Sequence, residues 1–327
     1  MVSAAAALLM GATPDGFAKK PVQVRVGSYN LRRAKLDDQR PDNNWQKREP
    51  RLIQSILDNE FDICGLQEVD SAEQESVPRM LAERGVEYGS YFFGPYAEDG
   101  HGTKAHGVLW RKDRFKLVGE PHHFWLSDPP EKKQVNDTGP KGKNKFIRGA
   151  FCVILKDRSN GRKYLMMVTH APLNKLQHNE AAHIIVEMEK KYNPKGWPSF
   201  FVGDLNTTER DDASAVYRSH WTDSYHFFDE KPEFRTGPEV TFNGWNLVDP
   251  AANHNRIDFI YYRGKGVTPL RYCCNDARYD GFFASDHFPV YVDFEIKQSY
   301  RYELHVQPLP LSRSQTREQA GTIPKDH

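Results

Sequence analysis

Several apolar runs in this chain end in the same way, with an acid, an amide or a histidine at the last apolar residue or just after it. The clearest case is Phe200–Val202, which continues into Gly203-Asp204-Leu205-Asn206. This pattern predicts a buried β-strand that ends in a loop with a function. Because Asp204 and Asn206 are two positions apart, their side chains point the same way on an extended chain. Gly203 would let the backbone turn there or pass close to a ligand.

The same ending recurs in other expected strands. One strand ends at Asn30, the next ends in Gln67-Glu68, and a later one ends in Thr169-His170. Towards the C-terminus, an acid lies early in one more strand, and Ser285-Asp286-His287 leads into a final strand. In an α/β sandwich, the strand ends on one side converge on a single cleft. We therefore expect a common site formed by Asn30, Glu68, His170, Asp204, Asn206, Asp258, Asp286 and His287.

The residue types in this expected site point to metal-assisted chemistry. Converging carboxylates repel one another, so they need a cation. Oxygen ligands with few nitrogens and no thiols suit magnesium or manganese rather than structural zinc. Asp204 would orient or deprotonate an attacking water, while Asn206 and His170 would hold phosphoryl oxygens. His287, paired with the carboxylate of Asp258, would stay protonated. Together the residues predict hydrolysis of a phosphoester.

Each member of the set also has a plain structural interpretation. The Gly-Asp-x-Asn stretch is rich in turn formers, and Glu68 could be a strand-end acid with a satisfied hydrogen bond. His170 could be a packed or surface histidine, and Ser285-Asp286-His287 could be only a turn before a strand. Asp258 is harder to explain in this way, because an inward acid in a core strand is costly without a partner.

Hydrophobic periodicity predicts strands that alternate with helices. Strands are expected at residues 22–30, 61–66, 91–93, 107–111, 115–125 (a pair), 146–156, 163–169, 199–202, 256–262, 267–274 and 288–294. Helices are expected from Pro50, from Ser71 to Gly85, around Ala181–Met188 and after a cap at Thr208. His101 and His106 fall in an expected exposed loop, and residues 127–144 form a long surface loop of the kind often found on a substrate side.

Length and charge bound the possible functions. The chain has 327 residues, and we expect one domain at 22–296. Residues 1–21 are either a signal peptide, which would imply secretion, or a disordered leader, and 297–327 form a polar tail expected to be disordered. The 45 basic and 44 acidic residues nearly cancel, which disfavours a strongly electrostatic nucleic-acid binder. No apolar run is long enough to span a bilayer, and the mean hydropathy of −0.73 suits a soluble protein. We expect a monomer, and we infer no stable protein partner.

The ordered set of strand-end motifs resembles the endonuclease/exonuclease/phosphatase superfamily, over about residues 22–296. Any one motif is weak, but their order along the chain is specific. Other segments, such as Trp110–Phe115 and Arg278–Gly281, look like a mostly uncharacterised, largely bacterial branch of it. The motifs that carry the resemblance are Ser28-Tyr29-Asn30, Leu66-Gln67-Glu68, Thr169-His170, Gly203-Asp204-Leu205-Asn206, Arg256-Ile257-Asp258-Phe259-Ile260 and Ser285-Asp286-His287-Phe288-Pro289-Val290.

This resemblance implies an α/β fold of the DNase I type, a four-layer sandwich of two packed mixed β-sheets flanked by helices. It implies that Glu68 is the principal ligand of Mg²⁺ (or Mn²⁺), with Asn30 and Asp286 near the metal. It also implies roles for the other members: Asp204 handles the proton of the nucleophile or leaving group, Asn206 and His170 contact the phosphate together with Asn30, and Asp258 supports His287. Arg148 sits where this branch carries an arginine before a strand, and is expected to face the substrate.

Three departures leave the substrate open. Leu173 stands where the branch has a second histidine, Trp245 stands in a run that is usually smaller, and Arg32 stands where apurinic endonucleases carry an acid. Superfamily substrates include DNA, RNA, inositol phosphates and sphingomyelin, and a nucleic acid is placed slightly ahead of a small phosphorylated molecule. The alternatives are a phosphatase or phospholipase C-type hydrolase on a small molecule or lipid, and a binding module without catalysis. A calcineurin-like metallophosphatase is disfavoured, because its Asp-x-His and Gly-Asn-His motifs are missing.

Overall fold

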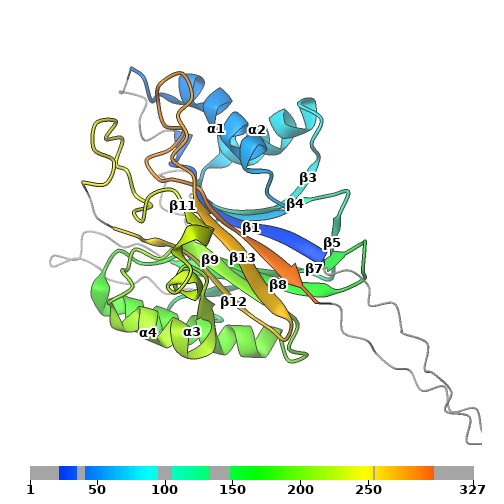
Figure 1. Cartoon of the computed structure of the whole chain (residues 1–327). Coiled ribbons are helices and arrows are strands. Elements are labelled where there is room, and N and C mark those ends of the chain that lie inside the picture. The colour runs from blue at the N-terminus through cyan, green and yellow to red at the C-terminus, as the bar shows by residue number, and fades with distance from the viewer. Residues whose placement is uncertain (1–21, 35–40, 95–104, 133–147, 253–254, 298–327) are drawn as a thin grey trace, which may run out of the picture.

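The computed structural model describes residues 22–34, 41–94, 105–132, 148–252 and 255–297 (Figure 1). These residues form two mixed seven-stranded sheets. The strands are β1 (Val22–Asn30), β2 (Ile63–Val69), β3 (Tyr88–Phe93), β4 (Ala105–Arg111), β5 (Phe115–Leu117), β6 (His122–Trp125), β7 (Gly149–Asp157), β8 (Lys163–His170), β9 (Ser199–Asp204), β10 (Thr222–Asp223), β11 (Arg235–Thr236), β12 (Asp258–Arg263), β13 (Val267–Cys274) and β14 (Val290–Ile296).

The order of strands in each sheet places the sequence motifs side by side. The first sheet has the order β11-β13-β14-β1-β2-β4-β3, and the second has the order β10-β12-β9-β8-β7-β5, with β6 paired to β7. β1 and β2 are parallel, as are β8 and β9, so that each pair ends on one edge of its sheet. β12 runs antiparallel to β9, so the start of β12 meets the end of β9.

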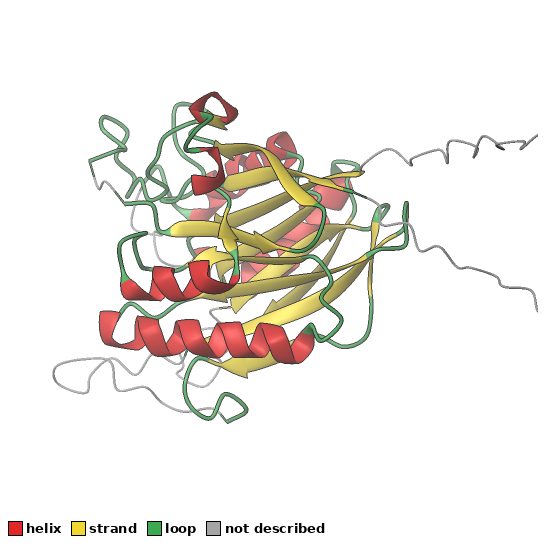
Figure 2. Cartoon of the chain, turned by 60° about the horizontal axis from the view of Figure 1, so that its bottom comes forward, coloured by secondary structure: helices red, strands yellow, loops and turns green. Residues whose placement is uncertain are grey.

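The described residues contain four α-helices, which cover the outer faces of the sheets (Figure 2). They are α1 (Trp45–Asn59), α2 (Ser71–Glu83), α3 (Lys175–Tyr192) and α4 (Asp212–His220), and two short 3-10 helices are η2 (His226–Phe228) and η3 (Pro232–Phe234). The apolar faces of α1 and α2 pack on the first sheet, and those of α3 and α4 pack on the second.

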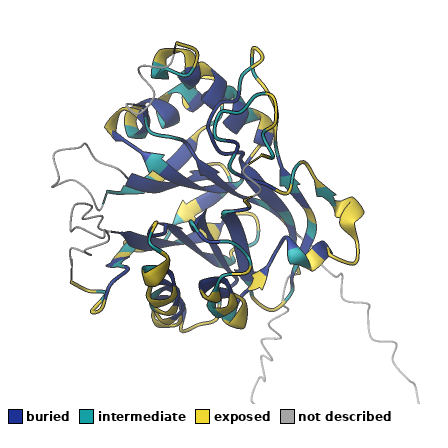
Figure 3. Ribbon diagram, turned by 90° about the vertical axis from the view of Figure 1, so that its left-hand side faces the viewer, coloured by how far each residue is buried: buried dark blue, intermediate teal, exposed yellow. Residues whose placement is uncertain are grey.

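Three apolar layers hold the four structural layers together. The largest lies between the sheets and includes Val24, Phe200, Val202 and Phe294, all fully buried. The other two lie beneath the two helix pairs, and buried positions line both faces of the central strands (Figure 3). Strands buried on both faces are expected to be almost continuously apolar, as β2, β8 and β9 are. The expected four-layer sandwich of two mixed sheets is therefore confirmed.

The expected helix starts are partly wrong. α1 begins at Trp45, because Asn44 caps it by accepting a hydrogen bond from the backbone of Lys47, and Pro50 lies inside the helix rather than at its start. α2 is capped by Asp70 with Glu73 in a reciprocal capping box, one residue earlier than the expected Ser71.

Two further local predictions are also corrected. α4 is capped at Asp211 and not at Thr208, whose backbone N–H donates to the Asp211 carboxylate at 2.6 Å. His106 is a buried residue of β4 and does not belong to an exposed loop, whereas His101 lies outside the described residues.

The remaining expected elements agree with the structure or lie beyond what it describes. The pair expected at 115–125 forms as β5 and β6, and each of these strands pairs with β7. The hairpin expected at Ser159-Asn160-Gly161 joins antiparallel β7 and β8. Most of the expected long loop, the leader 1–21 and almost all of the tail lie outside the described residues. No helix of the described part is long and apolar enough to cross a membrane.

Candidate active site

Strand register brings Asp204, His170 and Asp258 together. Asp204 is the last residue of β9, and its partner across the parallel β8 is His170, the last residue of that strand. Its partner across the antiparallel β12 is Asp258, the first residue of that strand. Both carboxylates are buried, and only the sheet register makes them neighbours, because the two residues are far apart in sequence.

The Asp204 carboxylate has three close polar neighbours. Asn30 Nδ2 donates to Asp204 Oδ2 at 3.0 Å, and His170 Nε2 lies 3.3 Å from the same oxygen. The backbone N–H of Asn206 donates to Asp204 Oδ1 at 3.1 Å. Burial raises the pKa of Asp204 to about 7, and the neighbouring Asp258 adds to the rise, while the positive charge of His287 opposes it. A carboxyl with a pKa near neutrality can exchange a proton at physiological pH.

A second pair, His287 and Asp258, lies next to Asp204. His287 Nδ1 is 2.8 Å from Asp258 Oδ2, and His287 Nε2 is 3.8 Å from Asp204 Oδ2. Burial by itself lowers the pKa of His287, but the charge of Asp258 and its hydrogen bond outweigh that effect and raise the pKa to about 10. The imidazole is therefore a cation at neutral pH, and its Nε2 faces the Asp204 carboxylate.

Two neighbours that the sequence analysis did not single out, Thr241 and Phe242, hold this pair. The Thr241 hydroxyl accepts hydrogen bonds from the backbone N–H groups of Ile257 and Asp258, both at 3.0 Å. The ring of Phe242 packs edge-on against His287 with centroids 5.0 Å apart, and these two residues form an isolated β-bridge. Ser285 Oγ donates to the carbonyl oxygen of Asn30 at 2.7 Å, and so joins the last motif to the first. No spacing rule in the sequence signals these contacts.

Asp286 lies at the opposite side of Asn30 and carries an ion pair. Arg32 Nη1 is 3.2 Å from Asp286 Oδ2, and the backbone N–H of Arg32 donates to Asn30 Oδ1 at 3.0 Å. Burial raises the pKa of Asp286, although His287 and Arg32 pull it in the other direction. The sequence analysis noted Arg32 only because it stands where apurinic endonucleases carry an acid. In the structure, Arg32 is a direct neighbour of Asp286, an expected metal ligand.

Glu68 follows Gln67, which is the register partner of Asn30 in the parallel β1–β2 pair. Its φ of 53° lies in the left-handed region, as does the φ of 49° at Asn206. Such backbone strain in a residue other than glycine tends to occur at functional sites. One carboxylate oxygen of Glu68, Oε2, is buried and has no hydrogen-bond partner among the described residues. A buried, unpartnered carboxylate oxygen is what a cation ligand would look like in a structure without the cation.

Among the described residues, the ligand atoms of Asp204, Asp258 and His287 all lie within 4.8 Å of one another. This cluster could also hold a metal ion. His287 Nδ1 already bonds to Asp258, which leaves Nε2 as the ring atom that would face an ion. Arg148, also predicted at the site, is buried, and its Nη1 donates to the carbonyl oxygen of His170 at 3.4 Å, at the end of β8.

Contacts thus join six of the expected residues directly, namely Asn30, His170, Asp204, Asn206, Asp258 and His287. Asp286 is connected to this group through its chain neighbour Ser285, whose hydroxyl bonds to Asn30. Glu68 is connected to it through strand register, because the preceding residue, Gln67, pairs with Asn30. The structure brings the predicted positions to one edge of the sandwich. Their chemical roles stay predictions.

The sequence of residues 27–287 matches the model of the endonuclease/exonuclease/phosphatase family. The chain belongs to this family. No curated protein sequence matches the chain.

Solved structures of the family have the same fold. An endonuclease/exonuclease/phosphatase family protein from Bacteroides thetaiotaomicron is 25% identical, with a TM-score of 0.71 over 85% of this chain and 100% of that chain. A mannosyl-6-phosphatase of the same organism is 25% identical, with a TM-score of 0.68 over 83% of this chain and 99% of that one. The catalytic domain of human Nocturnin, which was solved with a bound sulfate anion, is 18% identical at a TM-score of 0.65 over 83% and 94% of the two chains. At that identity the likeness concerns the fold alone.

Proposed function

We propose that this family member hydrolyses a small phosphoester with the help of a divalent cation, magnesium or manganese. The observation that carries the proposal is the position of Asp204. Its carboxyl has a pKa near neutrality, and it lies between Asn30, His170 and the cationic His287. This arrangement suits a group that takes up a proton beside a developing negative charge.

In the proposed reaction, Asp204 accepts a proton from a water molecule as the water oxygen forms a bond to phosphorus. The bond between phosphorus and the ester oxygen breaks, and Asp204 returns the proton to that leaving oxygen. The His287 cation, held by Asp258, stabilises the charge that builds up on the phosphoryl oxygens. Asn206 and His170 hydrogen-bond those oxygens and fix the phosphorus in line with the water.

The described residues offer two possible metal sites. The set predicted from the sequence consists of Glu68, Asn30 and Asp286, and it offers oxygen ligands only, which suits magnesium or manganese. Glu68 Oε2 has no hydrogen-bond partner among the described residues, which fits this set, but Asp258 Oδ1 in the other set has none either. The set of Asp204, Asp258 and His287 is compact, but Asp258 holds His287 as a cation, and a cationic imidazole does not bind a metal. We therefore favour Glu68, Asn30 and Asp286. A bound cation would polarise the phosphoryl group as a Lewis acid.

The substrate class follows from similarity and charge. The sequence alone places a nucleic acid slightly ahead of a small molecule. The likeness to the mannosyl-6-phosphatase, at 25% identity, supports a small phosphomonoester instead. The near balance of 45 basic and 44 acidic residues supports the same choice, because binding of nucleic acid relies on excess positive charge. A nuclease remains the second candidate.

A substrate panel tests the proposal. Wild type, Glu68→Ala, Asp204→Ala and the surface control Glu83→Ala are assayed with magnesium, with manganese and with a chelator. The panel holds 4-nitrophenyl phosphate, a hexose 6-phosphate, single-stranded RNA, DNA and sphingomyelin. We expect metal-dependent turnover of the small phosphate esters by wild type and by Glu83→Ala, and loss in the two site variants. If folded wild type cuts no substrate with either metal, the non-catalytic binding module becomes the better interpretation.

A further inference from the structure

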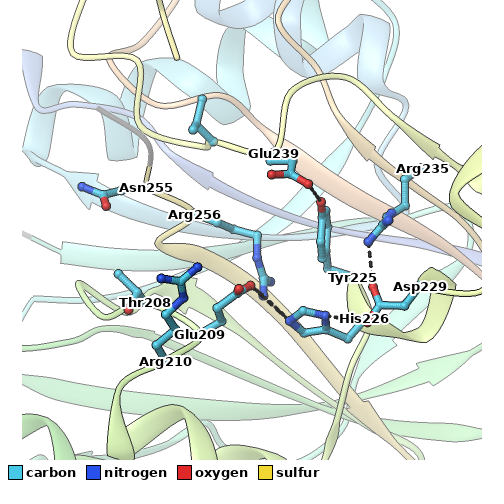
Figure 4. Close-up of a pocket in the computed structure, with 11 residues that line it drawn as sticks. Thr208, Glu209, Arg210, Tyr225, His226, Asp229, Arg235, Glu239, Asn255 and Arg256 are labelled. Carbon is cyan, nitrogen blue, oxygen red and sulfur yellow. Dashed lines mark hydrogen bonds and ion pairs between the residues drawn. The ribbon is translucent and has the colours of Figure 1, made fainter. Parts of the chain in front are cut away.

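A pocket of about 580 Å³ is lined by residues that are close in the chain to those of the candidate active site (Figure 4). Three chain segments that form its wall continue directly into the site. Thr208 and Arg210 follow Asn206 on the loop after β9, and Val240 precedes Thr241, which holds the backbone of Asp258. The carbonyl oxygen of Asn255 accepts a hydrogen bond at 3.0 Å from the backbone N–H of Thr241. We call this cavity the side pocket.

The side pocket is strongly polar but its charges cancel. Its lining holds three arginines, Arg210, Arg235 and Arg256, and three carboxylates, Glu209, Asp229 and Glu239. Two of the arginines form ion pairs within the wall: Arg235 with Asp229 at 2.9 Å and Arg256 with Glu209 at 3.2 Å. Donors and acceptors therefore lie side by side along the wall. A polyanion such as a nucleic-acid backbone would meet three carboxylates there, which opposes its binding.

The ring of Tyr225, which lines the side pocket beside the imidazole of His226, is already covered. Arg235 lies over the ring of Tyr225 at 4.3 Å from its centroid, and Arg256 lies over the same ring at 4.6 Å. Figure 4 shows the two guanidinium groups on opposite sides of the ring. The Tyr225 hydroxyl donates to Glu239 at 2.8 Å. Tyr225 therefore offers no open face on which a nucleobase could stack.

Two side chains of the wall remain available to a ligand. Arg210 is exposed and has no ion-pair or hydrogen-bond partner for its side chain among the described residues. The Asn255 side chain is likewise exposed and offers both an amide donor and a carbonyl acceptor. Both belong to chain segments of the wall that continue into the active site, at Asn206 and at Asp258.

We propose that the side pocket binds a polyhydroxylated ring, of a sugar or of inositol, that carries the phosphate to be hydrolysed. A hydroxyl group both donates and accepts hydrogen bonds, and so matches a wall on which guanidinium and carboxylate groups alternate without net charge. The volume of the side pocket is ample for one such ring. This inference rests on the proposed phosphoesterase function, because it assigns the part of the substrate that is not phosphate.

The test compares kcat/KM for ring phosphates with kcat/KM for 4-nitrophenyl phosphate, which lacks the hydroxyl groups. Glucose 6-phosphate and myo-inositol 1-phosphate serve as the two polyol probes, and adenosine 5′-monophosphate serves as the nucleotide probe. For each variant we take the ratio of kcat/KM on a polyol phosphate to kcat/KM on 4-nitrophenyl phosphate. We expect Arg210→Ala and Asn255→Ala each to lower this ratio by about tenfold, because each loses a hydrogen bond to the ligand. The matched control Arg79→Ala, an exposed arginine on α2, should leave the ratio at its wild-type value. The better of the two probes identifies the ring.

The outcomes separate this inference from the proposed function. Unchanged ratios in both variants, or a preference for the nucleotide that Arg210→Ala does not alter, would overturn the side-pocket proposal while the phosphoesterase stands. If wild type turns over none of the esters, calorimetry with glucose 6-phosphate on Asp204→Ala decides. Binding that Arg210→Ala weakens about tenfold supports the pocket without catalysis, and absence of binding rejects it.

Discussion

The hydrogen bond between His287 Nδ1 and Asp258 Oδ2, at 2.8 Å, joins the two sheets of the sandwich. Asp258 begins β12 in one sheet, and His287 leads into β14 in the other. Asn30 at the end of β1 and Asp204 at the end of β9 make a second link between the sheets, at 3.0 Å. The candidate site is therefore built across the sandwich, and any change in how the sheets pack would change its geometry.

Asp258→Asn should change the charge of His287. Without the Asp258 carboxylate, only the charges of Asp204 and Asp286 oppose burial, so the pKa of His287 falls from about 10 and the cationic share of the imidazole at pH 7 decreases. An NMR titration of the metal-free protein measures this directly. We expect kcat to fall by roughly 10²–10⁴-fold, as for loss of an acid–base group. A His287 that still titrates near pH 10 in the variant would show that Asp258 does not hold the charge.

Glu68→Gln should weaken metal binding. The substitution keeps the shape of the side chain but removes the charge of a carboxylate that has one unpartnered, buried oxygen. We expect affinity for manganese, measured by calorimetry or by electron paramagnetic resonance, to drop by more than about tenfold. The surface substitution Glu83→Gln serves as the control. If Asp258→Asn abolishes manganese binding and Glu68→Gln has no effect, the metal belongs to Asp204, Asp258 and His287 instead.

His106→Leu should make the protein less sensitive to acid. Burial, with a smaller contribution from Arg148, lowers the pKa of His106 to about 3, so the folded protein keeps this ring neutral. The unfolded chain takes up the proton near pH 6.5, and wild-type stability is therefore lost as pH falls from about 6.5 towards about 3, by up to about 1.4 kcal/mol per pH unit. At pH 5 this amounts to roughly 2 kcal/mol.

Urea denaturation at pH 7 and at pH 5 measures this effect. We expect the difference in unfolding free energy between the two pH values to shrink in His106→Leu by most of that amount. The exposed residue His183 provides the control, because His183→Leu should leave the difference as it is in wild type. An unchanged difference in His106→Leu would mean that another buried group governs the acid sensitivity.

Gly203→Ala should damage the fold and the site together. An added Cβ would meet the carbonyl oxygen of Thr169 in the neighbouring β8 at 2.2 Å, and a backbone atom in a sheet cannot move away cheaply. The expected cost in unfolding free energy is about 1–3 kcal/mol, with a further loss of activity per folded molecule because Asp204 is the next residue.

Gly85→Ala is the matched control for this substitution. No atom lies within 4 Å of its added Cβ, although its φ of 86° will cost about 1–2 kcal/mol. This variant should keep full activity per folded molecule. Full activity in Gly203→Ala as well would mean that β8 and β9 adjust without moving Asp204.

The glycine also illustrates what a sequence pattern leaves open. The sequence suggested that Gly203 serves a turn or the approach of a ligand, whereas in the structure it allows two strands to lie close together. The same pattern predicted the strand correctly, and the function of its end stays a prediction. A glycine indicates that another group lies close to the backbone, but only the neighbouring strand shows which group it is.

The predictions of two helix starts were wrong because they, too, depend on tertiary packing. Pro50 and Ser71 are plausible first-turn residues, but Asn44 and Asp70 cap the helices instead. Several nearby residues have the chemistry of a cap, and tertiary packing selects which one is used. The strand expected at 107–111 begins two residues earlier, at Ala105, so that His106 lies within it and its ring stacks on Phe151, with ring centroids 5.6 Å apart.

The sequence by itself determined which residues stand at the strand ends, because strand periodicity and residue chemistry are local properties of the chain. From these it predicted the set of acids, amides and histidines that meet at one edge, and the order of the motifs carried the resemblance to the family, which implied the two-sheet sandwich. Only the tertiary structure decided which of them touch: Asn30 and Asp204 are 174 residues apart and bond because β1 and β9 end at facing edges of two sheets. It also decided the ion pair of Arg32 with Asp286, the raised pKa of Asp204 and the side pocket. These properties depend on burial and on distances between remote segments, which no local pattern encodes.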